Sequence, residues 1–176
     1  MEEGGGPRLI DLLDSVQFVS AHPLDFARTD HDTTMAKVRL IETVAHHLNA
    51  ISIAEFGGHG EVGEREPGLV AQVVGAAFQT FGGFDPHPGA FDKAAMLLRG
   101  ITQGHPFNDA NKRTGFLVAA YLLKMMGRLP PDRLPVDDSV DLCLAISAGA
   151  IRDVDVIAQR LQDLWDPRRL QNPWDG

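Results

Sequence analysis

Residues 105–113, which read HPFNDANKR, bring together the side chains of this sequence whose types and spacing suit chemistry. His105 offers an imidazole, the side chain most readily poised to take a proton near neutral pH. Asp109 offers a carboxylate, which suits a hard cation such as Mg²⁺, and Lys112 and Arg113 offer charges that suit phosphate. These residue types together predict a site for a metal nucleotide.

A helix is expected to begin within this stretch, and its position strengthens the prediction of a nucleotide site. Asn111, Lys112 and Arg113 fall in its first turn, where unpaired backbone N–H groups and the helix dipole favour an anion. Cations are unfavourable there unless an external anion offsets them. Taken singly, Asp109 could be a helix cap and His105 a loop histidine, because such residues are common at these positions. Their combination favours the functional interpretation.

Apolar side chains recur at helical spacing through most of the chain and predict an all-α fold of six or seven helices. The segment 109–126 is apolar on every side, which indicates a central buried helix with the motif at its start. Residues 82–88 contain too many glycines and prolines for a helix and predict a loop or small hairpin. The other expected helices cover residues 7–19, 34–55, 67–81 and 91–104 and two segments after residue 137.

The composition is that of one soluble globular domain, with 176 residues of which 44% are hydrophobic and 23% charged. A formal net charge of −8 repels phosphate backbones and anionic lipids, so we expect no direct nucleic-acid binding. Cys143 is the only cysteine, which allows no intrachain disulfide. No apolar run is long enough to span a membrane, and the N-terminus lacks the features of a signal peptide. These features predict a cytoplasmic protein.

The run HPFNDANKR resembles the signature of the Fic/Doc family, His-x-Phe-x-(Asp/Glu)-(Gly/Ala)-Asn-(Gly/Lys)-Arg, at every defined position. Lys112 stands where the AMP-transferring members have glycine, and with the continuation NDANKRT it resembles the Doc (death-on-curing) toxin branch. The resemblance implies a Fic/Doc-type helical bundle around a central buried helix, with a short flap, in a domain over residues 34–166. Residues 1–33 would form an N-terminal extension and residues 167–176 a C-terminal tail.

The resemblance also implies roles for the residues of the motif. His105 would be the general base that deprotonates a hydroxyl of the target, Asp109 would hold Mg²⁺, and Phe107 would be structural. The phosphates of ATP would bind in an anion hole formed by Ala110, Asn111, Lys112 and Arg113.

Two positions bear on which phosphate is transferred. Lys112 replaces the glycine of the adenylyl-transferring members, and Phe116 stands where they carry a second arginine that holds the outer phosphates. The resemblance therefore implies a reversed nucleotide pose and transfer of the γ-phosphate to a threonine or serine hydroxyl. In the Doc toxin the acceptor is a threonine of elongation factor Tu, so arrest of translation is the implied effect. Adenylyl transfer and a catalytically silent binding module are the alternatives.

The same resemblance implies two protein partners, a target and an antitoxin. The family's flap, which clamps the target protein beside the site, would correspond to residues 82–88, with Phe84, Asp85 and His87 as target-binding residues. Some members also carry an inhibitory segment in which Ser or Thr is followed four residues later by Glu and then by Gly or Asn. This sequence contains no such segment, so we expect a small antitoxin protein to restrain it in trans.

Overall fold

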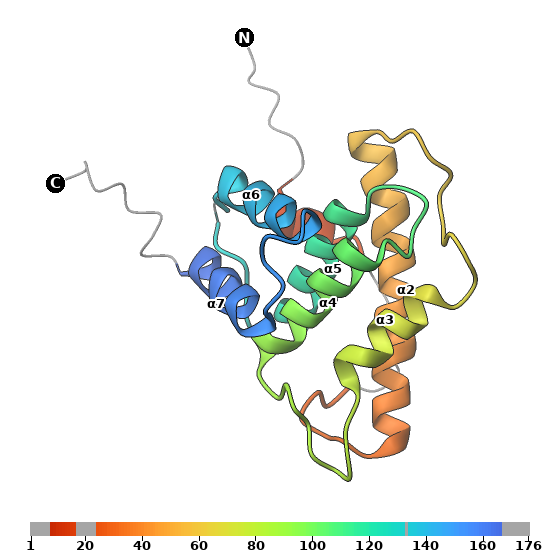
Figure 1. The fold of residues 1–176 in the computed structure, drawn as a ribbon, viewed down its shortest axis with the longest axis vertical. Helices are drawn as coiled ribbons and strands as arrows, with labels where there is room; N and C mark the ends of the chain where they lie inside the picture. Colours follow the sequence, from red (N-terminus) through yellow and green to blue (C-terminus); the bar gives the residue numbers. More distant parts are fainter. Residues whose placement is uncertain (1–7, 17–23, 133, 167–176) are drawn as a thin grey trace, which may run out of the picture.

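The computed structural model describes residues 8–16, 24–132 and 134–166, and this part of the chain is almost entirely helical (Figure 1). Pairing of β type within it is confined to two isolated bridges, Glu64 with Phe107 and Phe81 with Phe84. None of its helices has both the length and the hydrophobicity that crossing a bilayer requires. The described residues form seven helices, α1 (Leu9–Asp14), α2 (His31–Phe56), α3 (Leu69–Phe78), α4 (Ala90–Gly104), α5 (Asn111–Met125), α6 (Val136–Ser147) and α7 (Val154–Trp165). The predicted all-α fold is thus confirmed.

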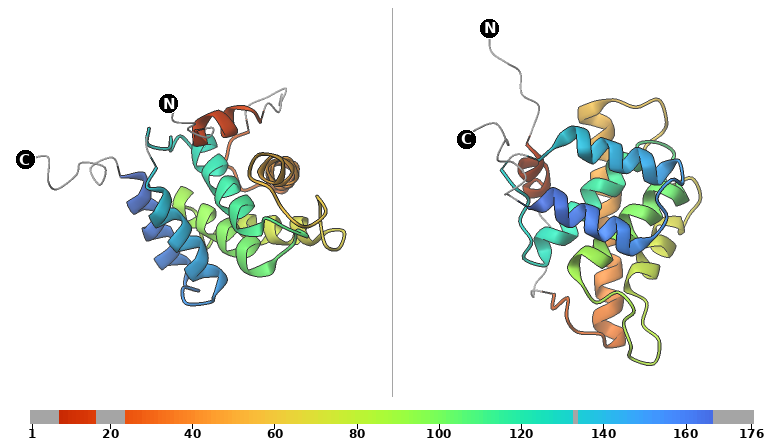
Figure 2. Two further views of the ribbon diagram at one scale, coloured as in Figure 1. Left: turned by 90° about the horizontal axis from the view of Figure 1, so that it is seen from above. Right: turned by 60° about the vertical axis from the view of Figure 1, so that its left-hand side comes forward.

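Helix α5 forms the centre of the bundle. Its residues 114–123 are all buried, α4 packs along it, and α1, α2 and α6 contact it from other sides. Two further views show α2 and α3 on one side of the α4–α5 pair and α6 and α7 on the other (Figure 2). The prediction of a central buried helix is therefore confirmed, and the motif at its start is supported from several directions.

Two helix ends differ from the sequence-based boundaries for local reasons. Helix α2 begins three residues before the expected residue 34, because the Asp30 carboxylate accepts a hydrogen bond from the Thr33 N–H at 3.0 Å and caps the helix. Helix α3 ends before the expected residue 81, because Phe81 and Phe84 exchange two backbone hydrogen bonds of 2.8 and 3.0 Å around a Gly-Gly turn. That turn agrees with the loop or small hairpin expected from the composition of residues 82–88.

The described parts of residues 1–33 contribute to the same hydrophobic core. Leu13 of α1 is fully buried, and Phe26 lies against Phe78 of α3 with ring centroids 6.3 Å apart. Within the described residues the first helix is shorter than expected and ends at Asp14. Residue 7 and residues 17–19 of the predicted helix lie outside the described residues.

Candidate active site

The motif forms the connection between α4 and α5, and its two ends have an unusual backbone. His105, the residue after α4, has φ 45° and Ala110, the residue before α5, has φ 59°. They are the two non-glycine residues with positive φ in the described part of the chain. Such conformations cost of order 1–3 kcal/mol each and persist only where the surroundings impose them. The connection is therefore a tightly specified turn.

Phe107 and Asn111 fix the middle of this turn. Phe107 is fully buried, as its predicted structural role requires. The side-chain amide of Asn111 binds the backbone of Phe107 on both sides: it accepts from the Phe107 N–H at 3.0 Å and donates to the Phe107 carbonyl at 2.9 Å. Because the Asn111 side chain is used in this way, its contribution to an anion site would come from its backbone N–H.

The N-terminus of α5 is open to an anion. Its N-cap is Ala110, which has no side chain able to cap, and the first intrahelical bond is donated by the Thr114 N–H to the Ala110 carbonyl at 2.8 Å. No group in the described residues accepts a hydrogen bond from the backbone N–H groups of residues 111–113. Lys112 is exposed beside them. Free N–H groups, the positive end of the helix dipole and a cation together favour phosphate.

Arg113 and Asp109 are both bound by the loop that follows α2, residues 57–66. Arg113 donates to the Gly57 carbonyl at 2.7 Å and lies over the Phe56 ring, 6.0 Å from its centroid. The Asp109 carboxylate accepts hydrogen bonds from the Ala110 N–H at 2.5 Å and, in the 57–66 loop, from the N–H groups of His59 at 2.7 Å and Gly60 at 3.1 Å. These bonds, with that from Ala110 the largest contributor, lower the pKa of Asp109 below its ordinary value of 3.8.

Glycines in the 57–66 loop permit this close approach. A Cβ atom added at Gly58 would lie 2.7 Å from Asp109 Oδ2, and one added at Gly60 would lie 2.9 Å from Asp109 Cβ. Both distances are shorter than real contacts of a Cβ atom. The loop can therefore reach the Asp109 carboxylate through its backbone because these two positions carry no side chain.

The same loop pairs with the motif along its backbone. The Arg65 N–H donates to the Pro106 carbonyl at 2.8 Å, and the Asn108 N–H donates to the Gly63 carbonyl at 3.0 Å. The Arg65 guanidinium donates to the His105 carbonyl at 3.2 Å, which helps to hold the strained backbone there. No hydrogen bond within the described residues involves the His105 imidazole, whose ring nitrogens remain available for proton transfer.

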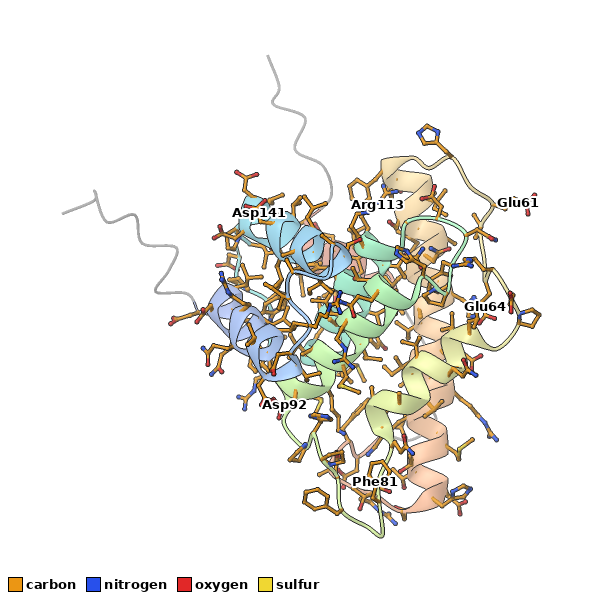
Figure 3. The ribbon with its side chains drawn as sticks, viewed as in Figure 1. Glu61, Glu64, Phe81, Asp92, Arg113 and Asp141 are labelled. Atoms are coloured by element: carbon orange, nitrogen blue, oxygen red, sulfur yellow. The ribbon has the colours of Figure 1, made fainter. Side chains whose placement is uncertain are left out.

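Residues 82–88 do not lie beside the motif, contrary to the sequence-based expectation for the flap. They precede the first residue of α4, whereas His105 follows its last residue. A helix of 15 residues separates the two ends, a length of about 22 Å at 1.5 Å per residue. Phe81, next to this segment, accordingly lies at the end of the molecule far from Arg113, with Glu64 between the two along the long axis (Figure 3).

Each of the predicted flap residues has a local role at that distant end. Phe84 is 68% exposed and takes part in the Gly-Gly turn. Asp85 forms an ion pair with the buried Lys93 of α4, with 2.6 Å between Oδ2 and Nζ, and accepts from the His87 N–H at 2.9 Å. The segment that does border the motif is the 57–66 loop. Its four glycines were the sequence signal for a close backbone approach.

Asp109 is the residue of the motif that could hold a metal ion. A carboxylate has about four lone-pair sites, and Asp109 uses one on Oδ1 and two on Oδ2. One site on Oδ1 remains, which could hold a single hard cation. A second group, Glu42, His46 and Glu64, places its potential ligand atoms within 4.8 Å of one another. There, however, the Glu64 carboxylate already accepts from the His46 ring and from the Gly68 and Val70 N–H groups at the start of α3.

One buried residue behind the site was not predicted from the sequence. Asn49 of α2 is fully buried and donates a hydrogen bond to the Asp109 carbonyl at 2.9 Å. Its signal was a lone amide among the apolar residues of a helix face, since a buried amide requires partners.

Comparison with known proteins identifies relatives of the chain. The profile of the Fic/DOC family matches residues 39–123, which include the 57–66 loop and the whole motif. The protein named Toxin Doc from Mycolicibacterium smegmatis (strain ATCC 700084 / mc(2)155) is 37% identical over 109 residues, which cover 62% of this chain and 79% of that protein. The match to the family therefore includes every residue that builds the motif.

Proposed function

The chain belongs to the Fic/DOC family, and we propose that it is a Doc-like toxin that transfers the γ-phosphate of ATP to a threonine or serine hydroxyl of a protein. The observation that carries this proposal is the uncapped start of α5, where free N–H groups and Lys112 lie between Asp109 and Arg113. Elongation factor Tu, the acceptor of the Doc toxin, is the proposed target. Phosphorylation of this factor would stop translation.

The residues present fit ATP with one Mg²⁺. Asp109 keeps a free lone pair on Oδ1 and would hold the metal, which when bound supplies charge neutralisation at the phosphate oxygens. The N–H groups of Asn111, Lys112 and Arg113 would bind those oxygens at the helix N-terminus. Arg113 would exchange the Gly57 carbonyl for a phosphate, a stronger partner for a guanidinium because it carries charge.

In the proposed reaction the substrate hydroxyl gives its proton to an imidazole nitrogen of His105. Its oxygen forms a bond to the γ-phosphorus, and the bond from that phosphorus to the β–γ bridging oxygen breaks. The bridging oxygen keeps the electron pair and ADP leaves. Such transfers depend mainly on positioning and on charge stabilisation, which Lys112, Arg113 and the α5 N-terminus would supply.

Two features favour the γ-phosphate over the α-phosphate. Lys112 extends from the first turn of α5, where a glycine would leave space for a different pose. Phe116, at the position of the second arginine in adenylyl-transferring members, is 9% exposed and packs against Trp165 at a centroid distance of 6.1 Å. It therefore offers no cation for the outer phosphates of a nucleotide in the adenylylating pose.

The 57–66 loop is the proposed clamp for the target, in place of residues 82–88. It pairs with the backbone of residues 106–108, so a target segment held along it would lie next to His105. Glu61 and Val62 are exposed in the middle of the loop, where a target would make contact. In this proposal residues 57–66, and not residues 82–88, hold the target beside His105.

Paired labelling with ATP tests the proposed transfer. The protein is incubated with Mg²⁺, purified elongation factor Tu and ATP labelled at either the α- or the γ-phosphate. We expect label from the γ-phosphate alone. The variant Lys112→Gly is expected to reduce γ-transfer by about tenfold or more, because a charge-assisted hydrogen bond contributes about 1.5–3 kcal/mol. Label from the α-phosphate in the wild type would contradict the proposal and support adenylyl transfer, and no label would support a binding module.

An apolar groove beside the anion site is the proposed place for the antitoxin. It has a volume of about 410 Å³ and lies between α1, the C-terminal end of α2, the first turns of α5 and one face of α6. Val136, Val140 and Leu144 form that face and are 49–65% exposed. The charged residues that line the groove are both cations, Lys112 and Arg113. This pattern fits a helix with an apolar face and an acidic end, which would cover the phosphate site while bound.

Inducible expression tests the toxin and its restraint. The wild type expressed alone is expected to arrest growth of a bacterial host, since no inhibitory segment is present in the sequence. Short reading frames of the source genome are co-expressed, and those that suppress the growth arrest are selected. These suppressors are expected to fail against the variant Val140→Glu, which places a charge in the apolar face of the groove. High-level expression without harm to the host would refute the toxin proposal.

A further inference from the structure

Asn49 is a fully buried polar residue that lies behind the motif. It lies in the C-terminal half of α2 and is fully buried, as are Ala45 and Leu48 on the same helix. Burial of an amide without partners costs free energy, so the bonds that such a residue makes define its place in the fold. The hydrogen-bond partners of the Asn49 amide therefore show which parts of the fold this residue holds together.

Its amide joins α2 to the loop that follows this helix and, 60 and 65 residues further along the chain, to the motif and to the start of α5. The Nδ2 group donates to the Asp109 carbonyl at 2.9 Å and to Thr114 Oγ1 at 3.1 Å. The Oδ1 atom accepts from the Gly63 N–H at 3.4 Å. One side chain thus connects α2 with the 57–66 loop, the motif and the first turn of α5.

We propose that Asn49 is a positioning residue for the metal nucleotide, an inference that rests on the proposed function. The carbonyl that it holds belongs to the peptide unit between Asp109 and Ala110. That unit precedes the positive-φ turn at Ala110, which directs the chain into α5. Its orientation fixes both the direction of the Asp109 carboxylate and the start of the helix that presents free N–H groups.

Asn111 and Asn49 hold different halves of the motif. Asn111 binds both backbone groups of Phe107, in the first half of the turn. Asn49 binds the carbonyl of Asp109, in the second half. Asn49 itself has no exposed atom with which to touch a nucleotide, so its effect on binding passes through Asp109 and the α5 N-terminus. Loss of Asn49 should therefore weaken binding of the metal nucleotide more than it slows proton transfer by His105.

The variant Asn49→Asp separates the bonds from the shape of the side chain. It keeps the size and the acceptor for Gly63, but it removes both donated bonds and places a carboxylate against the Asp109 carbonyl. The control is Leu48→Ala, which removes a fully buried side chain one residue away on α2 and which should destabilise the fold through a cavity. Both variants are compared with wild type at a temperature where all three are folded.

Hydrogen exchange and nucleotide binding are the two measurements. In Asn49→Asp we expect faster exchange confined to peptides that cover residues 109–116, and a Kd for Mg²⁺ with a non-hydrolysable ATP analogue that rises about 10- to 100-fold, as for other outer partners of metal ligands. We expect kcat at saturating nucleotide to change only a few-fold. In Leu48→Ala the Kd should stay near that of wild type.

Two results would overturn the inference: wild-type exchange over residues 109–116 in Asn49→Asp, or an equal rise in Kd in Leu48→Ala. If the wild-type protein binds no Mg²⁺ nucleotide, the proposed function fails, and the inference about nucleotide positioning fails with it. The exchange measurement then still reports whether Asn49 holds the motif, which separates an error about function from an error about structure.

Discussion

Replacing His105 with alanine is expected to lower the rate of phosphoryl transfer by about 10²- to 10⁴-fold, the usual contribution of a positioned general base. The fold should remain intact, because no hydrogen bond within the described residues depends on the imidazole. The backbone at this position is held by the Arg65 guanidinium and by the Ile101 carbonyl, neither of which contacts the ring. The measurement is the initial rate of label transfer from γ-labelled ATP, together with the melting temperature.

His87→Ala is the matched control for this prediction. Both histidines flank α4, but His87 lies before its first residue and His105 after its last. If the 57–66 loop and not residues 82–88 borders the site, His87→Ala should transfer label at the wild-type rate. A loss of rate in His87→Ala comparable with that in His105→Ala would contradict the placement of the site. A rate within about twofold of wild type in His105→Ala would remove the general base from the mechanism.

The fold and the core of the motif were predictable from sequence because they depend on local patterns. The apolar spacing of residues 109–126 fixes a buried helix wherever its neighbours lie, and the motif at its start acquires free N–H groups from that position alone. The resemblance implied a structural role for Phe107, and the residue is fully buried.

The partners of the motif were not predictable, because they come from contacts between distant segments. Residues 82–88 and 57–66 are both glycine-rich loops, and their composition does not indicate which of them lies close to residue 105. The length of α4 decides the question, since it carries the chain away from residues 82–88 before the motif begins. Asn49 lies 60 residues from Asp109 in sequence, so only the packing of α2 on α5 brings its amide to the motif.

Asp109→Ala is expected to abolish the dependence of nucleotide binding on Mg²⁺ and to lower the transfer rate by at least about 100-fold. A metal at a transferring phosphate contributes several kcal/mol, and about 2.7 kcal/mol corresponds to that factor. The variant also removes the acceptor of the His59 and Gly60 N–H groups, so faster hydrogen exchange in the 57–66 loop should accompany the loss. Isothermal titration with Mg²⁺ and a non-hydrolysable ATP analogue measures the first effect directly.

Asp153→Ala is the control that separates the metal from helix capping. The Asp153 carboxylate caps α7 by accepting from the Asp155 and Val156 N–H groups, so it resembles Asp109 in its bonds but lies outside the motif. Its loss should cost about 1 kcal/mol of stability and leave Mg²⁺ binding unchanged. Equal weakening of Mg²⁺ binding in both variants would show that Asp109 acts through stability alone.

The pH dependence gives an independent check on the same carboxylate. Hydrogen bonds from Ala110, His59 and Gly60 hold the pKa of Asp109 below its ordinary value of 3.8, so the group stays ionised as the pH falls from 7 to about 5. A lowered pKa in the folded state adds stability that is present above the unfolded-state pKa and is lost as the pH falls through the folded-state pKa. Loop exchange should therefore be flat from pH 7 to about 5 after correction for its intrinsic pH dependence, and protection should fall only in stronger acid. Asp109→Ala should lack that acid step, and a wild-type loop that opens already near pH 6 would show that another group holds it.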